Sequence, residues 1–145
     1  MLAPDVNVLV YAHRTDEAVH EPYREWLEDV VNRPAPFGLS WLVLGGFVRI
    51  VTNRRIYTDP TPLPAALAVV ESLLDRPNCR PLAPTAEHWA HFSSLCRASK
   101  ATGKLVSDAQ HAAVAIEHGC TWVSRDADFA RFEPHGLVWK HLVLG

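Results

Sequence analysis

The sequence lacks the features that mark membrane-bound, secreted and disulfide-rich proteins. None of its apolar runs approaches the ~18–20 residues that a helix needs to cross a bilayer, so no membrane insertion is expected. The N-terminal segment has no basic leader and carries Asp5 inside its apolar stretch, which argues against a secretory signal. The three cysteines, Cys79, Cys96 and Cys120, are an odd number without CxxC spacing. We therefore expect reduced thiols in a cytoplasmic protein.

An excess of basic residues, the simplest sign of a nucleic-acid-binding protein, is also missing. Lys and Arg total 14 against 16 Asp and Glu, which gives a formal net charge of −2. A strongly basic domain would have favoured RNA or DNA as a partner directly. Acidic residues gathered in one site and neutralised by metal would, however, lower the average charge without weakening such a site. Net charge therefore does not separate the function classes.

Several short catalytic motifs are absent as well. No G-x-S-x-G occurs, and no cysteine lies in a motif that marks a nucleophile. Gly103-Lys104-Leu105 lacks the Ser or Thr and the upstream glycine of a phosphate-binding loop. His88 and His91 have neither an HExxH motif nor a third ligand, so a zinc site is not favoured.

What the sequence does contain is a regular alternation of apolar strands and helical patterns. Hydrophobic residues make up 48% and charged residues 21%, enough for a core in a single domain spanning residues 1–145. The alternation is typical of an α/β fold with a mostly parallel central sheet. Strands are expected at 1–4, 37–39, 120–124 and 137–139. Helices are expected over 6–13, from Pro22 to Val31, over 41–53, from Leu63 to Leu74, after Thr85, and from Ser107 to Gly119.

Local patterns make these helix predictions more specific. Ser107 and Gln110 have capping-box spacing, so a helix is expected to begin at Ser107. Thr85 is expected to be the N-cap of the helix that follows it, on which Trp89, Phe92 and Cys96 fall on one side. The helix after the proline-rich 60–64 loop is expected to carry Leu63, Leu67, Val70 and Leu74.

Four aspartates stand where a parallel sheet gathers its ligands. Asp5 follows the first predicted strand, Asp126 and Asp128 follow the 120–124 strand, and Asp108 opens a helix. Ligand sites in such sheets form beyond the carboxyl ends of the strands. Clustered carboxylates repel one another unless a hard cation such as Mg²⁺ or Mn²⁺ lies among them. Such an ion lowers the pKa of a bound water and stabilises the charge of an attacked phosphate.

Structural roles remain open for several of these residues. Asp5, Asp126 and Asp128 can each be a helix cap or a first-turn acid. Asp108 is less easily explained in that way, because Ser107 would already supply the capping oxygen. The basic side chains at the end of the 41–53 helix can contact RNA phosphates, or they can form a solvated helix end that the dipole favours; they are Arg49, Arg54 and Arg55.

Four segments together resemble the PIN domains, with the best agreement among the VapC toxins of bacterial toxin–antitoxin pairs, particularly the mycobacterial branch. They are Asp5-Val-Asn-Val-Leu-Val-Tyr, Leu39-Ser-Trp-Leu-Val-Leu-Gly-Gly-Phe-Val-Arg-Ile-Val-Thr-Asn, Leu105-Val-Ser-Asp-Ala-Gln-His-Ala-Ala and Ser124-Arg-Asp-Ala-Asp-Phe. The resemblance runs over nearly the whole chain, in the expected order.

This resemblance implies a three-layer α/β/α fold and a Mg²⁺-dependent endoribonuclease that is restrained by a VapB-type antitoxin. Asp5 and Asp108 match the principal metal ligands of the family, and Asp126 and Asp128 match its later acids. Two further residues match polar positions near the site and are expected to orient the ligands; they are Asn7 and Ser124.

The sequence departs from the family at one position. Many PIN domains have a glutamate where this chain has Gly46, and no Asp or Glu occurs from Val30 through Thr58. We therefore expect a single weakly held ion rather than a tight pair. A PIN-fold module that binds RNA or protein without effective catalysis stays open as an alternative. A phosphoacceptor receiver domain is disfavoured, because Asp5 has no acidic neighbour and Lys140 lies in the wrong setting.

A homodimer is also expected, from the resemblance and from an aromatic and aliphatic stretch. This stretch carries more apolar surface than one helix face needs to bury, and it contains Trp41, Leu42, Leu44 and Phe47.

Overall fold

A five-stranded, fully parallel sheet forms the centre of the protein. The computed structural model describes residues 1–145. The strand order is β3-β2-β1-β4-β5, with parallel pairing throughout. The predicted α/β class is therefore confirmed. The strands are β1 (Leu2–Pro4), β2 (Phe37–Ser40), β3 (Cys79–Leu82), β4 (Thr121–Ser124) and β5 (Val138–His141).

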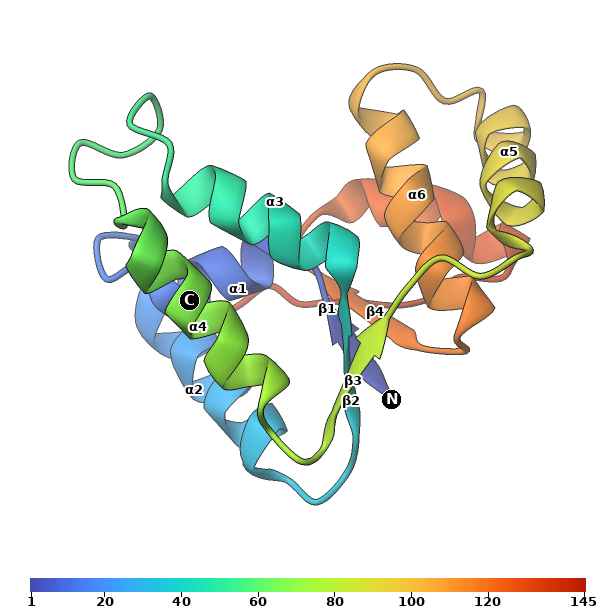
Figure 1. Cartoon of the computed structure of the whole chain (residues 1–145). Coiled ribbons are helices and arrows are strands. Elements are labelled where there is room, and N and C mark those ends of the chain that lie inside the picture. Colours follow the sequence, from blue (N-terminus) through green and yellow to red (C-terminus); the bar gives the residue numbers. More distant parts are fainter.

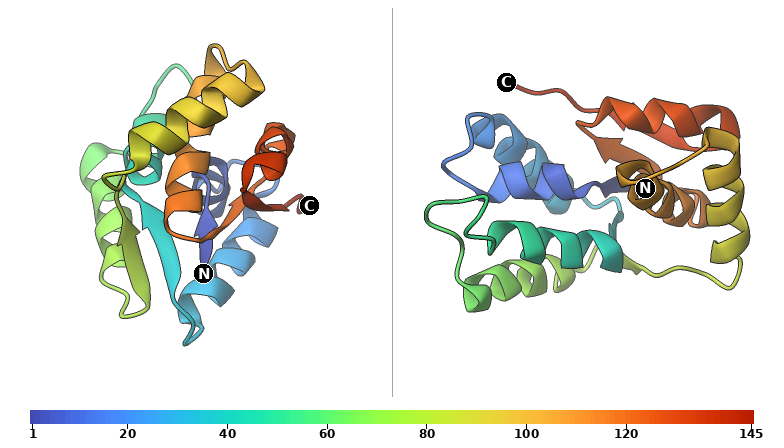
Figure 2. Two further views of the ribbon diagram at one scale, coloured as in Figure 1. Left: turned by 90° about the vertical axis from the view of Figure 1, so that its right-hand side faces the viewer. Right: turned by 90° about the horizontal axis from the view of Figure 1, so that it is seen from above.

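Helices cover both faces of this sheet and give three layers (Figures 1 and 2). One layer holds α1 (Val6–His13), α2 (His20–Asn32), α3 (Trp41–Val51) and α4 (Leu63–Leu74). The other holds α5 (His88–Ser99), α6 (Lys104–Glu117) and the 3₁₀ helix η1 (Ala127–His135). No helix is long and apolar enough to span a membrane.

The core lies where the two helical layers press on the sheet. On α3 the buried residues recur at helical spacing, and on α6 the predicted small side chains are buried against the sheet. Fully burying one aromatic such as Phe47 contributes up to about 3 kcal/mol. The residues in question are Val43, Leu44, Phe47 and Val51 on α3, and Ala109, Ala112 and Ala113 on α6.

Two helix starts differ from the predictions. Helix α6 begins at Lys104, directly after Gly103, whose φ is +59°. Ser107 is thus inside the helix rather than its cap, and Asp108 lies in the second turn. The left-handed backbone that glycine permits reverses the chain earlier than the capping-box pattern indicated. Helix α5 begins at His88. Thr85 instead caps the turn before it, since its Oγ1 accepts the N–H of Glu87 at 3.2 Å.

Helix α4 lies where it was predicted, but its large apolar residues are not its most buried ones. Leu63 is 54% exposed and Leu67 is 42% exposed, whereas Ala66 is the fully buried residue of this helix. Helix α4 packs at the β3 edge, mainly against α3 and β3, so its contact stripe is narrow. The small side chain of Ala66 allows the closest approach there.

Strand β3 was not predicted at all. Its sequence, Cys-Arg-Pro-Leu, is buried only at its two ends, Cys79 and Leu82. Because β3 is an edge strand, its middle residues face solvent, and proline is tolerated where no ladder hydrogen bond is required. A short edge strand of this kind leaves no apolar run in the sequence.

The order of the strands creates a crevice at one end of the sheet. The chain leaves β1 into one helical layer and leaves β4, the neighbour of β1, into the other layer. Ligand sites in open α/β sheets lie beyond the carboxyl ends of the strands at such a switch point. Pro4 and Val123 pair at these ends, directly before Asp5 and Ser124.

Candidate metal centre

Asp5 lies at the bottom of this crevice, where β1 passes into α1. It is the N-cap of α1: its Oδ1 accepts the N–H of Val6 at 2.6 Å, and its own N–H is held by the carbonyl of Val123 at 2.8 Å. Only 6% of the residue is exposed. Burial raises the pKa of this carboxyl to about 6, although hydrogen bonds from Ser124 and Val6 oppose the shift. Asp5 therefore caps a helix and also presents a buried carboxylate.

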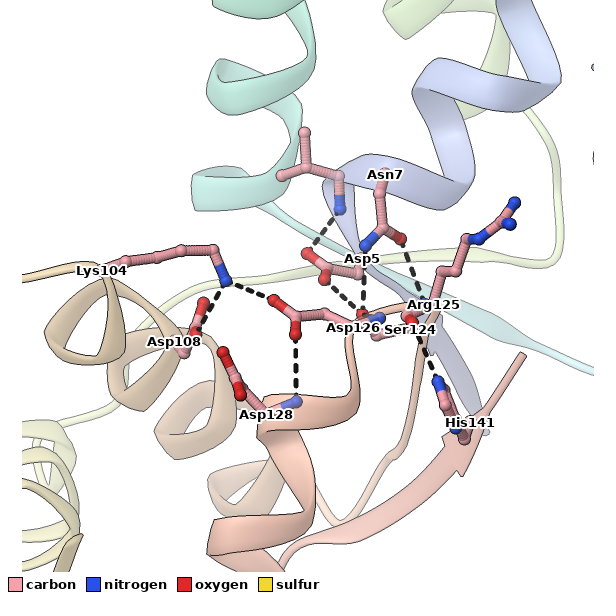
Figure 3. A network of polar contacts seen from close by, with 10 residues as sticks. Asp5, Asn7, Lys104, Asp108, Ser124, Arg125, Asp126, Asp128 and His141 are labelled. Atoms are coloured by element: carbon pink, nitrogen blue, oxygen red, sulfur yellow. Dashed lines mark hydrogen bonds and ion pairs between the residues drawn. The ribbon is translucent and has the colours of Figure 1, made fainter. Parts of the chain in front are cut away.

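Ser124, the last residue of β4, links the two sides of the site (Figure 3). Its fully buried hydroxyl donates to Asp5 Oδ2 at 2.6 Å. The same oxygen accepts the backbone N–H of Asp126 at 3.0 Å and the side-chain amide of Asn7 at 3.3 Å. Asn7 in turn accepts the N–H of Arg125 at 3.4 Å. The two residues expected to orient the ligands thus lie between the aspartates.

Asp126 and Asp128 occupy the turn from β4 into η1. Asp126 is the N-cap of η1, and its Oδ1 accepts the N–H of Asp128 at 3.0 Å. Asp108 reaches the same place from α6 and is 6% exposed. One carboxylate oxygen from each of Asp108, Asp126 and Asp128 lies within 4.8 Å of the other two. Sequence positions 20 residues apart are thereby brought into one acidic cluster.

Lys104 is the residue of this site that the sequence interpretation missed. It is the first residue of α6, and its Nζ donates to Asp108 Oδ2 at 3.2 Å and to Asp126 Oδ2. Burial by itself would raise the pKa of Asp126, but the hydrogen bonds from Lys104 and from the N–H of Asp128 lower it. Burial raises the pKa of Asp108, against the opposing charge of Lys104. The signal was the i, i+4 spacing of Lys104 and Asp108, which the misplaced helix start concealed.

The acidic cluster opens into a cleft of about 780 Å³. Asp5, Asp108 and Asp126 line one side of it, and α3 forms the opposite wall. Asp128 does not line this cleft, although its carboxylate belongs to the cluster. The wall of α3 contains both glycines, Gly45 and Gly46, and the side chain of Arg49. The cleft therefore has an acidic floor and a wall that bears one cation.

The remaining basic candidates lie elsewhere. Arg54 and Arg55 are exposed and do not line the cleft. Gly46 lies beside α1, where a Cβ at this position would approach Val6 Cγ2 to 3.0 Å. His88 is bonded to Glu117 at 2.7 Å, which ties α5 to α6, so this histidine takes no part in the site.

The donor set of the cluster suits one kind of ligand. Asp108, Asp126 and Asp128 offer only carboxylate oxygens to the cluster, and Asp5 adds a further carboxylate to the lining of the same cleft. Oxygen donors of this kind select hard cations such as Mg²⁺ or Mn²⁺ rather than zinc. The residues present therefore fit a divalent ion of that class.

Comparison with known proteins identifies the family. The sequence model of the PIN domain matches residues 2–133. Ribonuclease VapC43 of Mycobacterium tuberculosis is 46% identical over 141 residues, covering 97% of this chain and 95% of its own. Ribonuclease VapC25 of the same organism is 41% identical over 132 residues, covering 91% and 93%.

Solved structures agree on the fold. The sarcin–ricin loop cleaving toxin VapC20 of M. tuberculosis superposes with a TM-score of 0.68 at 19% identity, over 98% of both chains. VapBC2 of Rickettsia felis, solved with a promoter DNA fragment, gives a TM-score of 0.69 at 17% identity, over 96% of both chains. At this identity the likeness concerns the fold, while the family match rests on the sequence. The chain belongs to the PIN-domain family, within the group of VapC-type proteins.

Proposed function

We propose that this protein is a divalent-metal-dependent endoribonuclease and the toxin of a toxin–antitoxin pair. The observation that carries the proposal is the cluster of Asp108, Asp126 and Asp128 at the switch point of the sheet, together with Asp5 in the same open cleft as Asp108 and Asp126. The curated relatives at 46% and 41% identity, which are named ribonucleases, support the same activity.

In the proposed reaction the aspartates hold the divalent ion and fix its position beside the cleft. Asp5, Asp108 and Asp126 would bind Mg²⁺, with Mn²⁺ as a substitute, and Asp128 would complete the acidic set. When bound, the cation supplies positive charge to the attacked phosphate and activates the attacking water. Ser124 and Asn7 keep the carboxylates of Asp5 and the η1 turn in position. Such outer partners commonly change metal affinity by about 10–100-fold.

The cleft provides a path for the substrate strand. Arg49 on the α3 wall lies opposite the acidic floor and can pair with a phosphate oxygen of RNA. Arg54 and Arg55 lie outside the cleft, so they can contact only more distant phosphates. We expect the target to be a folded RNA cut in an unpaired loop, because proteins read RNA sequence mainly in such regions. A cellular RNA substrate implies a cytoplasmic location.

A VapB-type antitoxin and a second copy of the chain are the proposed protein partners. Structures that superpose on this chain were solved as VapBC assemblies, from Rickettsia felis and from Haemophilus influenzae. Leu44 and Phe47 are buried, so the sequence argument for a dimer from these two residues was wrong. Other exposed apolar residues support association, namely Trp41 of the same stretch and Ile56, Leu63 and Leu67 outside it. Light scattering tests the dimer, and a monomer at high concentration would contradict it.

The activity is tested by incubating the purified protein with a labelled pool of structured RNA and Mg²⁺. We expect cleavage that is abolished by chelation and by Asp126→Asn. Asp29→Asn, which alters an exposed aspartate paired with Arg33, is the matched control and should cut normally. Metal-independent cleavage would refute the metal site. RNA binding without cleavage in Mg²⁺ and Mn²⁺ would favour the alternative, a PIN-fold binding module, for which the missing carboxylate at Gly46 is the specific reason.

A further inference from the structure

The ammonium of Lys104 donates hydrogen bonds to carboxylate oxygens that would also be the ligands of a metal ion. Its Nζ is bonded to Oδ2 of Asp108 and to Oδ2 of Asp126, and both residues belong to the three-aspartate cluster (Figure 3). A divalent ion held by these carboxylates would lie close to the position of the ammonium. Two cations at such a distance repel each other strongly in a partly buried site. Lys104 and the metal therefore compete for the same ligands.

The side chain of Lys104 can move away from the two carboxylates. Its side chain is 67% exposed, and only the terminal nitrogen contacts the acids. Gly103 sets the start of α6 through its positive φ, and the helix hydrogen bonds do not involve the lysine side chain. A rotation of the stem would release both aspartates without moving the backbone. A lysine stem has several low-energy rotamers for such a movement.

The formal charges of the site also favour one divalent ion over two. The four aspartates carry a formal charge of −4, and Lys104 brings it to −3. One divalent ion leaves one negative charge uncompensated, whereas two such ions would leave one positive charge in excess. Helix α3 adds no carboxylate to the cleft, since Gly45 and Gly46 stand there and its one charged side chain in the lining is the cation Arg49; Glu17 is the one further acid of the lining, and its carboxylate accepts the hydroxyl of Tyr57.

We infer that Lys104 is an internal cation of the metal centre: it holds Asp108 and Asp126 together in the metal-free protein, competes with the incoming ion, and limits the site to one weakly bound divalent cation. This inference rests on the proposed metal-dependent function. It assigns Lys104 a positioning role, because the ammonium acts on the metal ligands. According to this inference, the side chain of Lys104 by itself lowers the affinity of the site for metal.

The test measures Mn²⁺ binding by calorimetry without RNA, for the wild type, Lys104→Met and Lys104→Arg. Removing the competing charge should tighten Mn²⁺ binding at least ~10-fold, which corresponds to ~1.4 kcal/mol. Lys104→Arg keeps the charge and should remain near the wild type. Lys140→Met is the matched control, since Lys140 is an exposed lysine of β5 without an acidic partner, and it should leave the Kd unchanged.

A second readout is the melting temperature. In chelator, Lys104→Met should melt below the wild type, because the carboxylates then repel without compensation. Addition of Mn²⁺ should raise its melting temperature more than that of the wild type. Both readouts are independent of RNA cleavage.

The possible results separate this inference from the proposed function. Equal or weaker Mn²⁺ binding by Lys104→Met would overturn the role of Lys104 and leave the ribonuclease proposal standing. Tighter binding by Lys104→Met together with no RNA cleavage by the wild type would support the inference and refute the function. Absence of Mn²⁺ binding in both proteins would overturn both.

Discussion

Replacing Asp5 by asparagine should make the metal-free protein more stable at neutral pH. Asp5 is 6% exposed, and burial raises its pKa from 3.8 to about 6. Above this pKa, the ionised carboxylate is less stable in the folded protein than in the unfolded chain, and this difference lowers the free energy of unfolding. A shift of ~2 pKa units corresponds to ~3 kcal/mol.

The sign follows from the direction of the shift. Since the folded-state pKa lies above the unfolded value, the stability linked to Asp5 is fully present below pH 3.8 and is lost as the pH rises through about 6. Asparagine resembles the neutral carboxyl and does not titrate. It keeps an oxygen that can accept the N–H of Val6. The stability difference between Asp5→Asn and the wild type should thus develop as the pH rises from 3.8 to about 6.

The assay is thermal unfolding in chelator across this pH range. For a domain of about this size, ~1 kcal/mol corresponds to roughly 2–4 °C, so Asp5→Asn should melt ~6–12 °C above the wild type at neutral pH. The gain should shrink towards zero in acid. Added Mn²⁺ should raise the melting temperature of the wild type and much less that of Asp5→Asn, because a ligand stabilises only the state that binds it.

Asp59→Asn, at an exposed loop position, is the control and should show no such pH-dependent gain. A variant Asp5→Asn that melts below the wild type at neutral pH would refute the reasoning. So would a difference that is the same in acid and at neutral pH, because it would mean that Asp5 acts only as a helix cap.

Four further substitutions, in the site and in the α3 wall, have expected outcomes. Ser124→Ala removes a hydroxyl that contacts three partners, so calorimetry should show weaker Mn²⁺ binding and denaturant unfolding a loss of ~1–3 kcal/mol; unchanged values in both would contradict its orienting role. Gly45→Ala should gain up to ~1 kcal/mol because its Cβ meets nothing within 4 Å. Gly46→Ala should gain less stability, because its Cβ would approach a methyl group of Val6 to 3.0 Å. Equal melting temperatures of Gly45→Ala and Gly46→Ala would show that α1 moves aside without cost. Asp128→Ala should lower RNA cleavage by more than ~100-fold if this exposed acid completes the metal site, and full activity would exclude it.

Much of the architecture could be predicted from the sequence, because its causes are local. Strand and helix patterns alternate along the chain, and this alternation specifies a parallel α/β sheet wherever hydrophobic faces must be covered on both sides. Small residues on one face of α6 and the left-handed glycine after it, Gly119, also have local causes. The positions of Asp5, Asp126 and Asp128 at strand ends could be predicted for the same reason. Their convergence followed from the rule for parallel sheets.

What the sequence could not determine depends on neighbours that are distant in the chain. Burial of Ala66 in place of Leu63 and Leu67 was decided by where α4 meets the edge of the sheet. Strand β3 exists because β2 offers it a partner, since its own residues have no apolar run.

The contact of Lys104 with Asp126 joins the start of α6 to the turn after β4, 22 residues further along the chain. No local pattern records this contact, because it arises when two segments following different strands are packed against the same switch point. The sequence by itself therefore determined which acidic residues to expect at this crevice. Only the tertiary structure decided that a lysine stands among them, because a charge pairs with whatever the fold brings within reach.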